Sequence, residues 1–445
     1  MEFSAFKQAV IARCAQKGIE EYELYYQTAE STSVSVFQHS VNEFTGSIEG
    51  GVCFRCIVGG RMGYASTEAL NEEQAMSIVD RAADNAVTLE ADEPVFLAEG
   101  GLSYAPITTP PYALPDTESL IARALDTQEK LYASDPAVID GTETQGICES
   151  SQVYIYNSKG LDLHSKTTLS GLIVGSVVTD GKEMANSYEI KLGELSAIDT
   201  DALAAKATAE AKQKLGGEVA PTGQYPVVFA PEAMCSLLGV FSAIFSSENA
   251  QKGLSKLGDK EGEVIAAPIV TLVDDPFFPG STRQRSFDAE GIPTFTKNVI
   301  EAGVFKTLLY NMKTAAVAGK KTTGNASKGG YDAPVAVRPF TMYLVPGEKS
   351  EEELLAPIEK GVYITSLGGL HAGANAITGD FSLQSSGFMI ELGKKTTFVK
   401  SFTVAGNFYT LLKDITEIAS ELETPGMGNF GSPAVRVDGL SIAGK

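Results

Sequence analysis

The sequence predicts an α+β protein in which two N-terminal α/β subdomains precede a larger, β-rich C-terminal domain with a buried central helix. Helical and strand-like patterns alternate up to residue 220, five prolines interrupt them over residues 92–116, and strand and turn patterns dominate after residue 221. At 445 residues the chain is long enough for two or three domains. The predicted domains cover 1–91, 117–220 and 221–445, and 92–116 forms a linker or a long crossing loop.

The first subdomain shows the order helix, strands, helix. Phe6, Val10 and Cys14 recur near one face of its first helix, as expected for an amphipathic helix. Strict alternation of apolar and polar residues predicts strands after it. The expected elements are a helix over 2–18, strands over 21–27 and 31–41, two strands within 50–67 around a turn at Gly59-Gly60, and a helix over 71–91.

The second subdomain repeats this order, so the two halves of residues 1–220 are expected to be variations on one plan. Its last helix ends at Gly216-Gly217, a glycine stop signal. The expected elements are a helix over 117–134, strands near 136–140, 143–156, 160–175 and 182–190, and a helix over 199–215.

The C-terminal domain begins with a strand over 225–230 and the central helix over 231–247, with Pro231 in the first turn of that helix. Only two later stretches have a helical pattern, 350–358 and 405–420. The remaining expected strands lie at 269–275, 303–310, 340–345, 361–367, 386–392, 395–404 and 434–444.

Composition and charge exclude several classes of protein. The net charge of −21 is spread along the chain without a basic cluster, which argues against direct binding of nucleic acid. No apolar stretch approaches the roughly 20 residues of a membrane helix, and the N-terminus lacks the layout of a signal peptide. Five scattered cysteines suggest reduced thiols, and we expect a cytoplasmic protein. Cys53 and Cys56 match C-x-x-C, but in a strand they point to opposite faces, so buried thiols are expected.

The central helix is apolar on nearly every side, which predicts that it is buried on all sides. Four small residues recur along it at helical spacing: Ser236, Gly239, Ala243 and Ser246. Such a strip lets another backbone come close. Tight packing against a strand is the simpler explanation, and passage of an extended peptide or of a partner's loop is the alternative.

Several stretches share glycines and polar turns in a characteristic order. They are GGVCFRCIVGGRMGYAST at 50–67, NAQKGLSKLGDKEGEVIAAPIVTLVDDP at 249–276, FDAEGIPT at 287–294, KKTTGNASKGG at 320–330 and NAITGDFSLQSSGFMIELGK at 375–394. In order and spacing, over about the whole chain, they resemble the TldD/PmbA family of metallopeptidases. The first stretch is similar to the family's G-V-x-x-R-x-I…G-R-x-G-Y segment, and the others to its C-terminal domain.

The resemblance has a consequence for metal binding. In the TldD-type subunit the central helix carries the motif H-E-x-x-x-H, whose two histidines hold zinc. The motif's two histidines and its glutamate align here with Leu238, Ala243 and Gly239, respectively. None of these three residues can bind zinc or act as a general base. The family's cysteine ligand near the C-terminus is also missing, because no cysteine follows Cys235. This pattern is similar to the PmbA (TldE) branch. The resemblance then implies no catalytic residue and no cofactor in this chain, and a TldD-type homologous subunit that carries the zinc.

The resemblance implies a heterodimeric peptidase that acts on small or unfolded peptides, in peptide maturation and antitoxin turnover, with its main interface in residues 1–220. Glycine-rich loops at 320–332 and 367–382 are expected to line the peptide chamber together with the four small residues of the central helix. The candidate peptide contacts are Ser236, Gly239, Ser246, Asn325, His371, Asn375 and Asp380.

Other roles stay open at this point. Asp274, Asp275, Asp288 and Glu290 could bind a hard cation, although capping of turns is the simpler role for them. The chain could be a self-sufficient metallopeptidase with ligands that the motif does not reveal. It could instead be a non-enzymatic modulator of DNA gyrase, as the older family name suggests. A homodimer of the isolated chain is also open.

Overall fold

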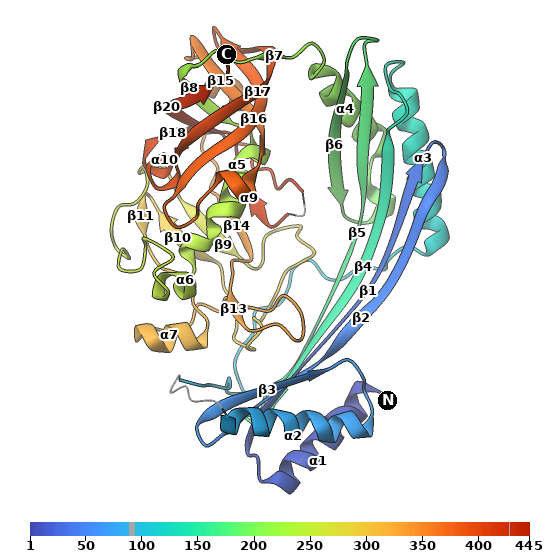
Figure 1. Cartoon of the computed structure of the whole chain (residues 1–445), viewed down its shortest axis with the longest axis vertical. Helices are drawn as coiled ribbons and strands as arrows, with labels where there is room; N and C mark the ends of the chain where they lie inside the picture. The colour runs from blue at the N-terminus through green and yellow to red at the C-terminus, as the bar shows by residue number, and fades with distance from the viewer. Residues whose placement is uncertain (89–93, 427) are drawn as a thin grey trace.

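The computed structural model describes residues 1–88, 94–426 and 428–445. Long strands of the N-terminal half run along one side of the molecule, and the C-terminal half packs beside them (Figure 1). The predicted boundary between residues 91 and 92, and the end of the helix expected over 71–91, lie outside the described residues.

The N-terminal half is one six-stranded antiparallel sheet with the strand order β3-β2-β1-β4-β5-β6. Four helices and one 3₁₀ turn accompany the strands. In chain order the elements are α1 (Phe3–Lys17), β1 (Glu21–Phe37), β2 (Ser40–Val58), β3 (Arg61–Thr67), α2 (Glu72–Thr88), α3 (Thr117–Ser134), β4 (Glu143–Asn157), β5 (Asp162–Thr179), β6 (Met184–Leu192), η1 (Leu195–Ala197) and α4 (Thr200–Gln213).

The two predicted N-terminal subdomains share this sheet. Strands β1 and β4 are its two central strands, and they pair from Glu23 opposite Asn157 to Phe37 opposite Glu143. On each side of this seam the order helix, three strands, helix recurs, which agrees with the expected common plan. The two units are therefore joined by backbone hydrogen bonds into one continuous body.

The hairpin between β1 and β2 differs from the prediction. The structure has one strand over 21–37 where two were expected, and β2 begins ten residues earlier than the predicted strand at 50. The turn lies at Gln38 and His39, whose φ angles of 47° and 62° are left-handed, as type I′ hairpins require. The His39 ring stacks on Tyr132 there. The first half of β2 was not predicted. Both of its faces are exposed, and its sequence therefore shows no alternation of apolar and polar residues.

The two faces of the sheet have different partners. Helices α1 and α2 pack on Leu24 and Phe54, and α3 and α4 pack on Val34 and Leu172, all on one face. The opposite face meets the C-terminal half through a cluster that includes Tyr25, Cys53, Ile155 and Phe287. Cys53 and Cys56 belong to different clusters on opposite faces, as predicted. All five cysteines are free and buried.

Residues 94–116 form a crossing segment between the two halves. Gln284 accepts hydrogen bonds from the backbone N–H groups of Thr108 and Thr109, and the Tyr104 hydroxyl donates to the Gly291 carbonyl. Toward the sheet, the backbone N–H of Tyr112 donates to Thr168. The segment is thus fixed on both sides, as expected for a crossing loop.

The C-terminal half contains two sheets around the central helix. The larger sheet has the order β18-β20-β8-β15-β16-β17-β7, and an additional pairing of β17 with β20 closes it on itself. The smaller sheet has the order β11-β10-β9-β14-β19, and β12 pairs with β13.

The strands of the C-terminal half, in chain order, are β7 (Glu218–Val219), β8 (Gly223–Phe229), β9 (Leu272–Asp275), β10 (Lys297–Glu301), β11 (Val304–Phe305), β12 (Ala326–Ser327), β13 (Ala336–Val337), β14 (Thr341–Leu344), β15 (Lys360–Gly368), β16 (Asp380–Glu391), β17 (Lys394–Asn407), β18 (Ile415–Ile418), β19 (Phe430–Gly431) and β20 (Val435–Ala443). Its helices are α5 (Pro231–Phe241), η2 (Ser242–Phe245), α6 (Ser247–Gln251), α7 (Met312–Ala318), α8 (Glu351–Leu355), α9 (Leu370–Gly373) and α10 (Phe408–Asp414).

The central helix α5 lies between the two sheets (Figure 1). Its side chains join one core cluster with Val227 and Phe229 of the larger sheet and with Leu272 and Met342 of the smaller one. The single helix expected over 231–247 is not continuous, because the α-helix ends at Phe241 and passes through a 3₁₀ turn into α6. Within the described residues, no helix has the length and apolar character needed to cross a membrane.

A buried ion pair lies on the sheet face that meets the C-terminal half. Arg55 Nε donates to Glu23 Oε1 over 2.7 Å, and both side chains are almost fully buried. Substitution Arg55→Leu leaves Glu23 buried without its partner, so we expect the free energy of unfolding in urea to fall by about 3–5 kcal/mol. The matched control is Arg13→Leu, which removes a partly exposed pair with Asp80 and should lower the free energy of unfolding far less, because water screens this pair. Equal losses for the two variants would contradict the assignment.

Candidate peptide-binding site

The central helix has one open side. Leu237, Leu238 and Phe241 are fully buried between the sheets, whereas Gly239 is exposed and Ser236 is partly exposed. Ala243 is also partly exposed. The prediction that the helix is buried on all sides is therefore wrong. The small residues leave a shallow strip that neighbouring elements only partly cover, and a Cβ atom added at Gly239 would lie 3.6 Å from the Phe430 ring, an ordinary contact distance.

The helix ends where the strip continues. Backbone N–H of Ser246 donates to the carbonyl of Ala243, and the amide of Asn249 donates to the same carbonyl over 2.9 Å. Ser246 is extended and forms a bridge to Leu309, so its position in the strip is buried. The open strip thus consists of Ser236, Gly239 and Ala243, and we call these three residues the small strip.

Aromatic stacking brings a C-terminal loop to the end of α5. The Phe241 ring stacks on Phe408 with centroids 4.5 Å apart and meets Phe381 edge-on at 6.2 Å. Phe381 follows directly after the predicted contact Asp380, so the loop over residues 375–380 leads to the buried side of α5 near its C-terminal end.

The polar residues of this loop shape the loop itself. Asn375 Oδ1 accepts from the N–H groups of Ile377 and Thr378, and Asp380 accepts from Asn407 over 2.8 Å. The hydrogen bond from Asn407 lowers the pKa of Asp380, which keeps this exposed carboxylate ionised. Both side chains retain exposed surface for a ligand, but neither is arranged as a general base.

His371 lies on the short helix α9 and is exposed. In the described part of the chain its ring has no hydrogen-bond partner. Acid–base or nucleophilic catalysis requires a base within hydrogen-bond reach of its partner group. The surroundings of His371 therefore favour a contact role over a catalytic one.

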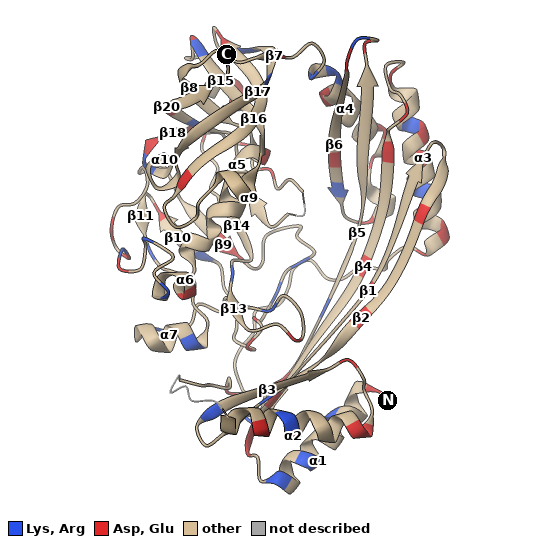
Figure 2. Ribbon diagram, viewed as in Figure 1, with Lys and Arg blue, Asp and Glu red and all other residues tan. Residues whose placement is uncertain are grey.

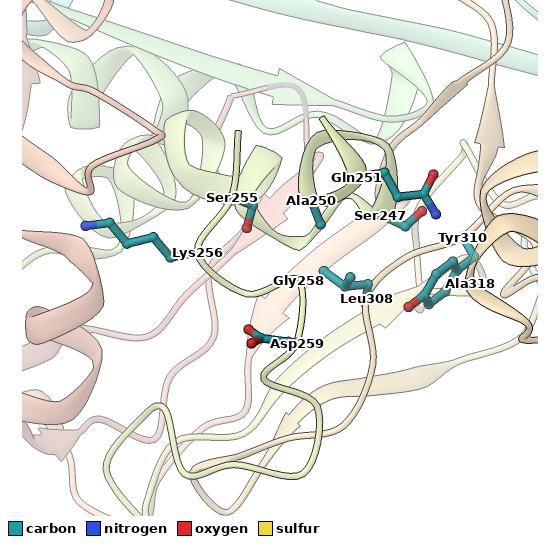
Figure 3. Close-up of a pocket in the computed structure, with 10 residues that line it drawn as sticks. All are labelled: Ser247, Ala250, Gln251, Ser255, Lys256, Gly258, Asp259, Leu308, Tyr310 and Ala318. Carbon is teal, nitrogen blue, oxygen red and sulfur yellow. The ribbon is translucent and has the colours of Figure 1, made fainter. Parts of the chain in front are cut away.

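A cavity of about 390 Å³ lies beyond the 3₁₀ turn (Figure 3). Ser255 in its wall donates to the carbonyl of Ile244, which ties the cavity to the turn. Lys256 donates to the carbonyl of Thr378 over 2.7 Å and lies over the Tyr409 ring, which ties the cavity to the loop over 375–380. Its lining residues are Ser247, Ala250, Gln251, Ser255, Lys256, Gly258, Asp259, Leu308, Tyr310 and Ala318.

Asn325 does not lie at a surface. It is fully buried, donates to Asp274 over 2.7 Å and accepts from Lys297 and Thr323. Its amide also donates to the carbonyl of Arg338, so its polar atoms are fully engaged inside the protein. The structure corrects the prediction of a peptide contact here. The sequence around Asn325 is a glycine-rich loop, and nothing in it predicts that the buried Asp274 is its hydrogen-bond partner.

The acidic residues have structural partners. Asp274 accepts from Lys297 and from the N–H of Phe340, and Asp275 accepts from Thr296. Asp288 accepts from three backbone N–H groups, while burial and the neighbouring Glu290 raise its pKa to about 8. These residues stabilise turns and strand ends, as the simpler prediction holds.

The residues present do not fit a zinc site at the central helix. Leu238 is a buried hydrocarbon side chain, Gly239 has no side chain and Ala243 has only a methyl group. Across residues 1–88, 94–426 and 428–445, no group of three or more His, Cys, Asp or Glu side chains is arranged to hold a metal ion. No catalytic step through a metal can be derived for this chain.

Comparison with protein-family models gives three matches in chain order. Residues 22–86 match domain 1 of the PmbA/TldA metallopeptidases, residues 110–215 match the central domain, and residues 222–444 match the C-terminal domain. The last match alone covers half of the chain. The chain belongs to the TldD/PmbA family. The matches also agree with the α+β fold class and with the sequence resemblance.

Individual relatives cover nearly the whole chain. The protein MJ0231 of Methanocaldococcus jannaschii is 26% identical over 428 residues, which is 96% of this chain and 97% of that protein. A Thermotoga maritima structure, described as a candidate modulator of a DNA gyrase, is 29% identical, with a TM-score of 0.90, and the match covers 99% of this chain and 100% of that one. The structure of TldE from Thermococcus kodakarensis has a TM-score of 0.88 at 23% identity, covers 98% of this chain and 99% of that one, and shows similarity of fold.

The sequence did not reveal several residues that line this region. Lys256, Tyr310 and Tyr409 come from different segments, and only the tertiary fold brings Lys256 to Tyr409 and to the 375–380 loop. Lys256 lies in the family-like stretch 249–276, so the motif marked the segment without marking the residue.

The two sides of α5 should respond differently to polar substitution. Leu238→His places an imidazole in the core, and we expect the free energy of unfolding in urea to fall by about 3 kcal/mol, from lost packing and an unpaired polar group. Gly239→Glu places a carboxylate on the open side, and the change should stay within about 0.5 kcal/mol. A large loss for Gly239→Glu would show that this side is closed.

Proposed function

We propose that this chain is the metal-free partner subunit of a TldD-type zinc peptidase and belongs to the PmbA (TldE) branch. In that complex it shapes the chamber that binds small or unfolded peptides. The observation that carries the proposal is the open side of α5, where Gly239 and Ala243 stand at positions that hold a glutamate and a histidine in the TldD type. The helix keeps its place between the sheets, but the residues at the three aligned motif positions, Leu238, Gly239 and Ala243, have no group that could bind zinc.

The small strip suits an extended peptide. Residues without long side chains let a peptide backbone come close to the helix, and the loop over 375–380 offers exposed polar groups near the end of α5. The 390 Å³ cavity beyond the 3₁₀ turn has room for a side chain. Recognition of backbone and shape suits substrates of varied sequence. The roles that we propose in proteolysis, peptide maturation and antitoxin turnover are those that the family resemblance implies.

We place the complex in the cytoplasm on the basis of the thiols. All five cysteines are free, and burial raises the pKa of each, for example that of Cys235 to about 12. Reduced thiols are the rule in that compartment.

For the interface with the TldD-type subunit we propose residues 1–220. Among the described residues, the first half of β2 pairs with β1 alone, which leaves its other edge open, and it exposes Val41, Phe44 and Ile48. An open apolar edge strand is a ready site for a second chain. A second copy of this chain in the absence of the partner is the alternative occupant.

The proposal is tested with the purified chain, a TldD-type homologue that carries H-E-x-x-x-H, and their mixture. We expect the chain alone to hold no stoichiometric zinc by metal analysis and to cleave no peptide. The mixture should form a heterodimer and cleave unfolded peptides, and a chelator should abolish the cleavage. Stoichiometric zinc with chelator-sensitive cleavage in the isolated chain would establish the self-sufficient peptidase instead.

A modulator of DNA gyrase is the second candidate, because the Thermotoga maritima relative carries that description. The net charge of −21 disfavours direct contact with DNA. Salt-dependent binding of the chain to duplex DNA at physiological ionic strength would favour this candidate over the peptidase subunit.

The edge of β2 gives a separate prediction. Substitution Ile48→Glu should weaken heterodimer formation at least about tenfold in sedimentation analysis, because it places a charge in an apolar contact. Leu392→Glu is the matched control, since Leu392 is 82% exposed, as Ile48 is, but lies in the C-terminal half. Equal association of the two variants would move the interface away from β2.

A further inference from the structure

A second cavity, of about 260 Å³, separates the N-terminal sheet from the C-terminal loops. It opens on the sheet face that carries no helices. Its sheet side is formed by Tyr25, Gln27, Ser151, Val153 and Ser165. Its loop side is formed by residues within 283–289, 326–328 and 338–341 and by Asn429. The small strip does not line it.

Four cationic side chains line this cavity: Arg283, Arg285, Lys328 and Arg338. They come from three separate segments, and basic segments are visible on the loops around β13 between the two halves (Figure 2). In the described part of the chain, none of the four has a carboxylate within salt-bridge distance. This is unusual in a protein with 56 acidic and 35 basic residues, in which lysines and arginines elsewhere commonly form ion pairs.

The carboxylate that lines the cavity does not neutralise these cations. Asp288 uses one oxygen to accept from the N–H groups of Glu290 and Ile292 and the other to accept from the N–H of Ala326. Arg283 donates to the neutral Asn429 instead. The cavity is thus lined by four cationic side chains and one carboxylate, whose oxygens are engaged by backbone N–H groups and not by these cations.

Burial makes the unpaired charge costly. Arg285 and Lys328 are only partly exposed, and burial lowers the pKa of both. Lys328 Nζ lies 5.0 Å from the centre of the Tyr25 ring and beside the Cys53 thiol, and both are weaker partners than an anion. Charge-assisted hydrogen bonds from arginine to a carboxylate are among the strongest in proteins, so a bound anion would offset this cost.

One further polar atom lacks a partner. The buried side-chain oxygen of Gln27, on the sheet side of the cavity, accepts no hydrogen bond. A ligand that satisfies both features carries an anion and, close to it, an N–H donor. The carboxylate end of a peptide supplies both groups, because a backbone N–H stands next to the terminal carboxylate.

We propose that this cavity recognises a peptide carboxylate, which Arg285 and Lys328 hold from inside and Arg283 and Arg338 hold at the rim. Gln27 accepts from the adjoining peptide N–H. The inference rests on the proposed function and specifies its substrate class as peptides with a free C-terminus or an acidic side chain.

The test uses the full-length chain and three six-residue peptides of alanine and glycine with an N-terminal fluorophore. One ends in a free carboxylate, one in an amide, and one in an amide with glutamate at a central position. In fluorescence anisotropy we expect at least one of the two carboxylate peptides to bind at least about tenfold more tightly than the neutral peptide. Comparison of these two peptides shows whether the cavity binds the terminal carboxylate or the glutamate side chain. Equal binding of all three peptides would overturn the proposal and leave the peptidase-subunit function intact.

Variants test the residues. Arg285→Gln, Arg338→Gln and Lys328→Met should each reduce the preference for the carboxylate at least about fivefold. Arg61→Gln and Arg81→Gln remove the same charge from the N-terminal half, where neither residue has a carboxylate partner, and should leave the preference unchanged. An equal loss in these controls would indicate only long-range attraction and overturn the proposal. If Arg285→Gln does not fold, the other two variants decide. The proposal is overturned if Arg338→Gln and Lys328→Met both keep the full preference for the carboxylate peptide over the neutral peptide.

Competition with inorganic phosphate distinguishes a general anion site from a peptide site. We expect an acetylated dipeptide with a free carboxylate to displace the labelled peptide at least about tenfold more effectively than phosphate, because phosphate lacks the N–H for Gln27. Equal displacement would overturn the assignment to peptides. If the mixture with the TldD-type homologue cleaves no peptide, that result counts against the proposed function. It leaves the ratio of binding between carboxylate and neutral peptides unchanged.

Discussion

The packing of α5 between two sheets is the constraint on which the rest of the C-terminal half depends. Leu237, Leu238 and Phe241 must be buried there because both sheets place apolar side chains against them. A helix held in this way has a fixed orientation, and only its narrow remaining side is free to vary. In this chain that side carries small residues, so the helix can keep its structural role without ligands for a metal. Loss of the ligands and preservation of the fold are therefore compatible.

The N-terminal sheet determines where the C-terminal half can pack. Four helices cover one of its faces, so the C-terminal half can pack only on the other. That contact buries the Glu23–Arg55 pair and leaves the cavity lined by cations between the halves. In the described part of the chain, four cations lie together there without an ion pair. The peptide carboxylate that we propose as the ligand would bring the opposing charge.

The family assignment and the proposed subunit role have different foundations. Three domain matches in order establish the family. The role of a metal-free partner remains our proposal, and it rests on the residues at three positions that the family motif aligns, Leu238, Gly239 and Ala243. A chemical argument of this kind is specific, because imidazole and carboxylate groups cannot be replaced by methyl groups or hydrogen in a zinc site.

The sequence by itself determined the fold class, most of the helices and the family. The helix predicted over 117–134 agrees with Thr117–Ser134, because its apolar period and its Asp116 cap are local signals. Tertiary structure alone decided which surfaces are open. The first half of β2 has no buried face, so no local pattern predicted it. Asn325 is buried and donates a hydrogen bond to Asp274, which is far away in the sequence. Burial and charge pairing depend on contacts between distant segments, and the pattern of a single segment does not contain them.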